Sequence, residues 1–264
     1  MRYLKAGTDE ERWEIMKEIM ELRADYLLRH AFSGFKMSLN KAKYILSHED
    51  GLTADEKAAR RVLFAALDNL ADFAVAEEYQ MMKNFPADGG KTDDEDDDTE
   101  YTEVFQKYNS AYADTEDMDV EDAMRIALLM YGVTDGTVFT YMTQGDDRVR
   151  PWHLQYEGYS APKGYFPEWL VPPIEHGCRC FLIEDSVFGA SKASDVKAEI
   201  HVEPTMPYWF NRTFKECVGM GGRIFSDEHP YFNVNSADFE KLKVVSDSIE
   251  EKYLTPEDDE KDNT

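Results

Sequence analysis

Two histidines and two cysteines lie close together in the second half of the chain, at His153, His176, Cys178 and Cys180. Two imidazoles and two thiolates form a donor set that suits tetrahedral Zn²⁺. On an extended segment, the C-x-C spacing would place both sulfurs on one face, with Arg179 on the other. The spacing differs from the common C-x₂-C pairs of zinc sites. We therefore expect no bound cofactor, with the cysteines as small buried hydrophobic residues and the histidines in local hydrogen bonds, and a Zn²⁺ site stays open as the alternative.

The same residue types give less support to catalysis. A Cys–His nucleophile pair needs an accessible thiolate and a third group that orients the imidazole, and the sequence has no recognisable signature of such a site. Asp146, Asp147 and His153 are of the types found in metal-dependent nucleases, but the remainder of a nuclease motif is missing. We predict that the chain is not an enzyme, with a metal-dependent hydrolase as the weaker alternative.

Opposite charges follow one another at the end of a predicted strand, as Asp146, Asp147, Arg148 and Arg150. An arginine presents a planar set of donors that can bind a carboxylate through two bonds or hold several loop carbonyls. The surrounding residues are rich in Gly, Pro and aromatic types, so buried backbone groups need such partners. We predict a structural clamp here, and the alternative is an exposed charged turn.

The first third of the chain has the pattern of a helical hairpin or small bundle. Thr8 with Glu11, and Thr53 with Glu56, have the spacing of capping boxes at helix starts. Apolar residues at helical intervals extend from these starts to about residue 30 and about residue 83, and a short helix is predicted over 39–46. Long helices with short connections favour antiparallel packing. We assign residues 1–85 to this helical region.

An acidic segment interrupts the helical pattern. Residues 93–100 read DDEDDDTE, and Pro86, Gly89 and Gly90 precede them. Carboxylates that repel one another, without apolar neighbours, cannot offset the entropy lost on ordering. We predict a flexible insertion over 86–118, with Asp119 as the N-cap of the helix that follows. The alternative is an acidic docking segment for a basic partner.

The remaining residues predict strands, turns and one final helix. The helix after Asp119 should end at Gly132, strands are predicted over 138–143 and 181–184, and the pattern over 201–235 allows further short strands. Residues 186–200 have an ambiguous pattern, and a last helix is predicted over 237–252. The fold class is therefore α+β: an N-terminal helical hairpin or bundle, followed by a loop-rich domain with a small β-sheet over 119–235, then a helix and a disordered acidic tail over 236–264.

The overall charge narrows the range of partners. The chain carries 54 acidic and 29 basic residues, a formal net charge of −25. Proteins bind duplex DNA through Lys and Arg that replace its counterions, so this balance argues against non-specific nucleic-acid binding. The three cysteines do not form a disulfide framework, no apolar run approaches the roughly 20 residues that span a bilayer, and the first residues lack a signal-peptide core. We expect a soluble protein of a reducing cytoplasm without a membrane partner.

The order of motifs over 118–182 resembles that of the Mu F-like family of phage head-morphogenesis (minor capsid) proteins. A helix, MDVEDAMRIALLMYG, leads to the predicted strand and then to QGDDRVRPWH over 144–153, and a proline-rich span leads to EHGCRCFL over 175–182. These segments are similar to the family's T-x-G-D-x-R-V-x-x-x-H and P…CRC motifs. A downstream part is also similar, with MPYWFNR at 206–212, GGRIF at 221–225 and DEHPYF at 227–232. The positions that carry the resemblance are Thr143, Asp146, Asp147, Arg148, Arg150, His153, Cys178, Arg179 and Cys180.

The resemblance implies a structural role in the virion of a tailed bacteriophage. Members of the family lie inside the head near the portal vertex, contact the portal protein, and act in head assembly and in DNA packaging or ejection. Major capsid or scaffold protein is a further implied partner, and several copies per virion are expected, assembled in the host bacterial cytoplasm. The alternative within the same setting is an ejected cargo protein or a connector-ring component.

Overall fold

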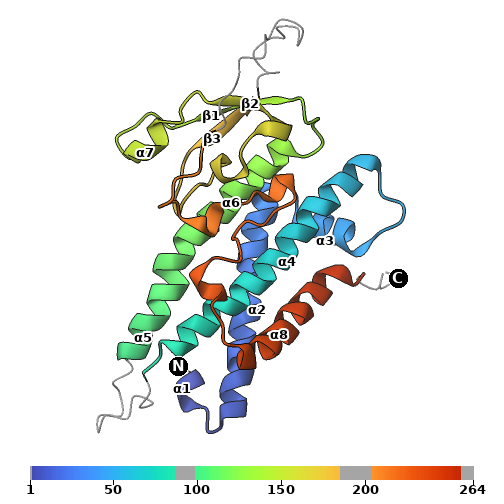
Figure 1. The fold of residues 1–264 in the computed structure, drawn as a ribbon. Helices are drawn as coiled ribbons and strands as arrows, with labels where there is room; N and C mark the ends of the chain where they lie inside the picture. Colours follow the sequence, from blue (N-terminus) through green and yellow to red (C-terminus); the bar gives the residue numbers. More distant parts are fainter. Residues whose placement is uncertain (1, 87–98, 185–203, 257–264) are drawn as a thin grey trace, which may run out of the picture.

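Long helices form most of the molecule, and a small sheet lies at one end of them (Figure 1). The computed structural model describes residues 2–86, 99–184 and 204–256. Its helices are α1 (Arg2–Lys5), α2 (Asp9–Gly34), α3 (Leu39–Ser47), α4 (Ala54–Lys83), α5 (Thr99–Gln106), a π-helix (Lys107–Tyr112), α6 (Ala113–Met130), α7 (Pro151–Leu154) and α8 (Ser236–Leu254). Together with the sheet, they give the predicted α+β fold class.

The N-terminal helices start where their capping residues predict. Thr53 accepts a hydrogen bond from the backbone N–H of Glu56, whose carboxylate accepts from the N–H of Thr53, so α4 begins with the predicted capping box and ends at Lys83. Thr8 caps α2 in the same way, but the Glu11 carboxylate accepts from the N–H of Gly7 instead of Thr8. The predicted helices over 39–46 and 237–252 correspond to α3 and α8.

The flexible insertion predicted over 86–118 is wrong for the residues after 98. α5, the π-helix and α6 continue from one to the next over 99–130, and residues 87–98 lie outside the described residues. Tyr101 and Tyr108 are buried at 4% and 7% exposure, which provides the apolar contact that the acidic run lacks. Asp119 is not an N-cap either. It lies buried within α6. This helix ends at Met130, and Gly132 just beyond it has the expected positive φ of 72°.

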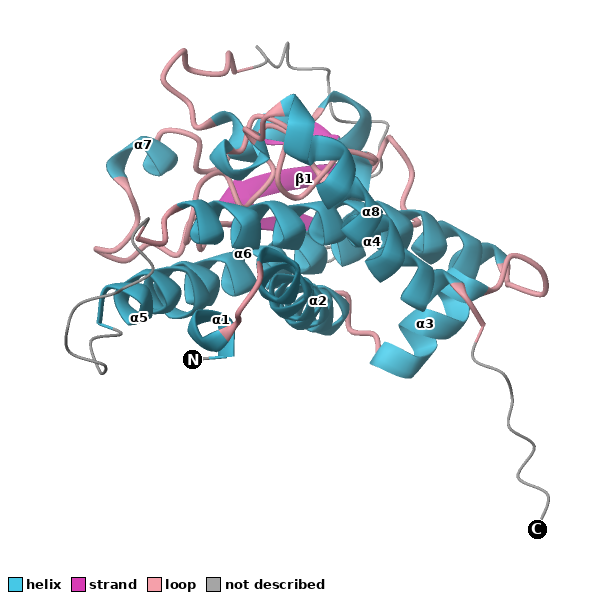
Figure 2. Ribbon diagram, turned by 90° about the horizontal axis from the view of Figure 1, so that it is seen from below, coloured by secondary structure: helices cyan, strands magenta, loops and turns pink. Residues whose placement is uncertain are grey.

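A three-stranded antiparallel sheet follows α6. β1 (Val138–Met142) lies between β2 (Ser160–Pro162) and β3 (Phe181–Glu184), with Thr140 opposite Ser160 on one side and Ile183 on the other. β1 and β3 confirm the predicted strands, whereas β2 was not predicted because three residues carry too little alternation. Figure 2 shows α6 between this sheet and α2, so one helix connects the two parts of the core.

The chain after residue 203 returns to the helical bundle without adding a strand. Over the described residues 204–235 it forms 3₁₀ turns at Arg212–Phe214, Val218–Met220 and Pro230–Phe232, where the sequence pattern allowed strands. Phe214 and Phe225 are buried in the same cluster as the α2 and α4 side chains. Phe225 stacks on Phe73 of α4 with ring centroids 4.0 Å apart. This segment is therefore part of the bundle core.

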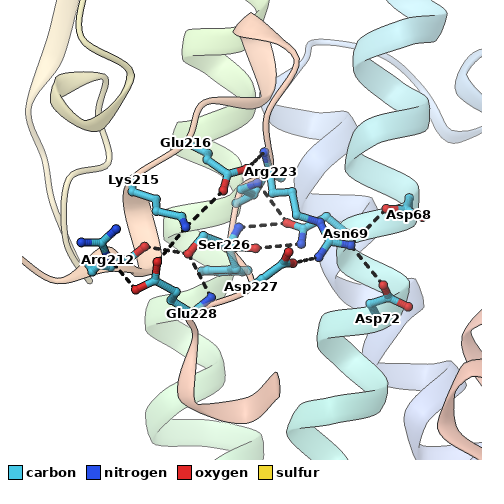
Figure 3. A network of polar contacts seen from close by, with 12 residues as sticks. Asp68, Asn69, Asp72, Arg212, Lys215, Glu216, Arg223, Ser226, Asp227 and Glu228 are labelled. Atoms are coloured by element: carbon cyan, nitrogen blue, oxygen red, sulfur yellow. Dashed lines mark hydrogen bonds and ion pairs between the residues drawn. The ribbon is translucent and has the colours of Figure 1, made fainter. Parts of the chain in front are cut away.

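A polar network fixes this returning segment on α4 (Figure 3). Asn69, fully buried, donates to the carbonyl of Phe225 at 2.9 Å and accepts from the N–H groups of Ile224 and Phe225 at 3.0 and 2.9 Å. Arg223 reaches Asp68 and Asp72 of α4, both at 3.1 Å. One side chain thus supplies the hydrogen bonds that a strand partner would otherwise provide.

Candidate functional site

Three of the four candidate metal ligands meet beside the sheet. His153 lies on α7, and Cys178 and Cys180 lie in the extended segment that enters β3. His153 Nδ1 is 3.2 Å from the Cys180 sulfur and 3.9 Å from the Cys178 sulfur. One ligand atom from each residue lies within 4.8 Å of the others, and all three side chains are buried. The C-x-C alternation places both sulfurs inward and leaves Arg179 partly exposed, as predicted.

Glu175 orients the imidazole of His153, and sequence reasoning missed it. Its Oε1 atom lies 2.6 Å from His153 Nε2, accepts from the Trp152 indole at 3.1 Å and pairs with Arg150 Nε at 2.9 Å. Because a carboxylate only accepts hydrogen bonds, it places the ring proton on Nε2 and leaves the Nδ1 lone pair facing the sulfurs. The signal for Glu175 was its place three residues before Cys178, next to His176.

The close packing shifts the pKa values of all three groups. The hydrogen bond between the sulfurs lowers the pKa of Cys180 and raises that of Cys178, and burial adds to the rise at Cys178. Burial alone would lower the pKa of His153, but its hydrogen bonds to Cys178 and Glu175 outweigh this and raise it. Tyr141, fully buried, lies beside Cys180, and burial strongly raises the pKa of its hydroxyl.

This arrangement is compatible with two kinds of chemistry. The order Cys180, His153, Glu175 is that of a thiol nucleophile with its base and orienting carboxylate. The same imidazole with both sulfurs is a ligand set for a soft divalent metal. A small opening to solvent beside the cluster is lined by Arg148, Val149, Arg150, His153, Gly177, Arg179 and Cys180. An opening of this size suits an ion or a water molecule better than a polymeric substrate.

His176, the fourth candidate ligand, is not part of the cluster. Its Nδ1 atom lies 3.2 Å from Asp119 Oδ2, and the ring packs edge-on against Phe214. The other Asp119 oxygen accepts from the N–H of Gly177 at 2.8 Å. Burial raises the pKa of Asp119, partly opposed by these hydrogen bonds. The pair therefore ties the C-x-C segment to α6.

The predicted charge clamp is present, but its members differ from those expected. Asp146 binds Arg179 through two hydrogen bonds of 2.6 and 2.9 Å, and this contact lowers the pKa of Asp146. Arg150 donates to the carbonyl of His176 at 2.7 Å. The side chains of Asp147 and Arg148 are exposed, and Arg148 contributes its backbone N–H to Asp146. Of the four residues predicted for the clamp, Asp146 and Arg150 therefore make its contacts, and Arg179 joins them.

Thr143 connects the end of β1 to the loop that carries these residues. Its hydroxyl bonds the Glu157 carboxylate and also accepts from the N–H of Gly145 at 3.3 Å. Gly145 has a positive φ of 66°, a conformation that glycine adopts without strain. The conformation of the loop thus follows from its first residues.

Comparison of the chain with protein families, with curated proteins and with solved structures finds no match. No helix in the described parts of the chain is long and apolar enough to cross a membrane. The Mu F-like resemblance therefore rests on the motif residues alone and stays a prediction.

Proposed function

We propose that this chain is a minor head protein of a tailed bacteriophage, acting at the portal vertex in head assembly. The observation that carries the proposal is the contact between the two motif segments. Asp146 from the first segment binds Arg179 from the second, and Arg150 holds the carbonyl of His176. Residues that the resemblance groups by sequence order are therefore also one unit in space.

The way this unit joins the helices supports a structural role. Asp119 of α6 holds both His176 and the N–H of Gly177, and α6 in turn packs along α2. These hydrogen bonds to the buried Asp119 connect the motif unit to the bundle. The net charge of −25 suits a protein that works beside packaged DNA without adhering to it.

Counting the chain in purified virions tests the proposal. Quantitative mass spectrometry of particles from cells that carry its gene should find several copies per portal assembly. A cryo-EM map of the portal vertex should then show ordered density for the chain in contact with the portal. Absence from virions contradicts the proposal, and presence without ordered density favours an ejected cargo protein.

A further inference from the structure

We infer that His153, Cys178 and Cys180 bind one Zn²⁺ ion, with the fourth ligand position directed to the small solvent opening. The inference rests on the geometry of the cluster and is independent of the proposed head-assembly function. It replaces the four-residue candidate set taken from the sequence, because His176 is bonded to Asp119 instead.

The distances between the three ligand atoms fit a tetrahedral ion. Zn–N bonds of about 2.0 Å and Zn–S bonds of about 2.3 Å place neighbouring ligand atoms roughly 3.5 to 3.8 Å apart. His153 Nδ1 lies 3.2 Å from one sulfur and 3.9 Å from the other, on either side of this value. The third edge lies within the 4.8 Å limit of the cluster. The two nitrogen–sulfur distances therefore differ from those of a bound ion by only a few tenths of an ångström.

The surroundings of His153 prepare it for metal binding. Glu175 accepts from Nε2 at 2.6 Å, which is the carboxylate–histidine contact that orients metal-bound imidazoles. Glu175 is itself held by the Trp152 indole and by Arg150. The Nδ1 lone pair is thereby directed at the sulfurs in the tautomer that a metal requires.

Burial and access favour an ion over a nucleophilic thiol. Cys178 and Cys180 are 2% and 7% exposed, and of the two sulfur-bearing residues only Cys180 lines the small opening beside the cluster. A nucleophile requires a cleft for its substrate, whereas Zn²⁺ requires only its ligands and one water. A nucleophile also leaves Cys178 without a role. Two thiolates with an imidazole select a soft or borderline metal, of which zinc is the common one.

Metal titration of the full chain tests the inference. After removal of metal by a chelator under reducing conditions, the chain should bind one Zn²⁺ with a dissociation constant below about 1 μM. Co²⁺ in its place should give the visible bands of a tetrahedral site and the charge-transfer absorption of two thiolates. Cys178→Ser and Cys180→Ser should each weaken Zn²⁺ binding by more than about a hundredfold. Glu175→Gln should weaken it about 10- to 100-fold while the Co²⁺ spectrum keeps its form.

Two variants serve as matched controls. Cys217→Ser should retain one Zn²⁺ per chain with wild-type affinity, because Cys217 lies apart from the cluster with its sulfur against Met130. His176→Gln should also retain one Zn²⁺ per chain, because His176 binds Asp119 and not the cluster. Loss of binding in His176→Gln, or its persistence in Cys178→Ser and Cys180→Ser, overturns the three-ligand site. If a cysteine variant does not fold, the Co²⁺ spectrum of the wild-type chain decides instead. The absence of thiolate charge-transfer absorption from that spectrum would also overturn the three-ligand site. Alkylation of Cys180 at the same rate with and without saturating Zn²⁺ would point to a nucleophilic thiol instead.

Discussion

One arginine holds three acidic side chains inside the helical bundle. Arg23 of α2 binds Glu77 at 2.7 Å, Glu116 at 2.9 Å and Asp117 at 2.6 Å. Arg23, Glu77 and Glu116 are almost fully buried. Glu78 lies beside this group, and neither of its carboxylate oxygens has a hydrogen-bond partner among the described residues. The bundle interior thus contains more negative than positive groups, which makes the protonation of Glu78 important for stability.

Replacing Glu78 with glutamine should remove a pH-dependent loss of stability. Burial raises the pKa of Glu78 from 4.5 to about 7. The folded state therefore holds a proton that the unfolded state has released, so Glu78 makes the free energy of unfolding fall as pH rises from about 4.5 through 7. We expect Glu78→Gln to be more stable than wild type by about 2 kcal/mol at pH 8 and about equal to it at pH 4.5, measured by urea unfolding. Glu240→Gln, at an exposed position of α8, is the control and should follow the wild-type dependence of the unfolding free energy on pH. If Glu78→Gln follows it too, Glu78 does not have this role.

Asn69 should be one of the most sensitive positions in the chain. Its amide satisfies three buried backbone groups of Ile224 and Phe225, so Asn69→Ala leaves them without partners. We expect the free energy of unfolding to fall by about 3 kcal/mol in denaturant titrations. Asn40→Ala, at an exposed site of α3, should change it by less than about 0.5 kcal/mol. Similar values for the two variants would show that the 204–235 segment is not held by Asn69.

At the level of elements, the crossing of α2 and α6 depends on a glycine. A Cβ atom on Gly34 would lie 2.2 Å from the backbone oxygen of Glu121, and the obstructing atom cannot rotate away. Gly34→Ala should therefore destabilise the chain by more than about 2 kcal/mol. Gly136→Ala, whose Cβ would meet nothing closer than Thr134 Oγ1 at 3.9 Å, should stay within about 1 kcal/mol of wild type. Thermal melts of the two variants compare their unfolding midpoints directly. A wild-type midpoint for Gly34→Ala would show that α2 and α6 can move apart without loss of stability.

The local sequence pattern predicted a flexible insertion where α5, the π-helix and the start of α6 form continuous helix. The acidic run at 93–98 led to the predicted flexible insertion, and further acidic residues follow at Glu100 and Glu103. Tyr101 packs on Phe85 at 5.1 Å between ring centroids, and its hydroxyl donates to the carbonyl of Pro86. These contacts join α5 to the residues that follow α4, about 15 positions earlier in the chain. A pattern of neighbouring residues does not contain contacts at this separation. They stabilise the helix in spite of its acidic neighbours.

For the whole molecule, the sheet and the bundle should unfold together. Trp152, Trp169 and Trp209 lie around the sheet, whereas far-UV circular dichroism follows the long helices. In a Trp13→Phe variant, which removes the tryptophan on α2, fluorescence and circular dichroism should give thermal midpoints within about 2 °C of each other. We expect this because α6 and Asp119 connect both parts through buried contacts. A separate, earlier fluorescence transition would show that the sheet region is an independent unit.

The sequence by itself determined the starts and approximate ends of α2, α3, α4 and α8, two of the three described strands and the grouping of the motif residues. Capping hydrogen bonds and apolar intervals act between residues three or four apart, so the sequence contains them directly. The tertiary structure decided which side chains meet. His176 pairs with Asp119 across 57 residues, Asn69 binds Phe225 across 156, and Glu175 supplies the partner of His153. Because such contacts depend on how helices and loops pack, only the folded chain shows that three of the four candidate side chains, and not all four, lie together in one buried cluster.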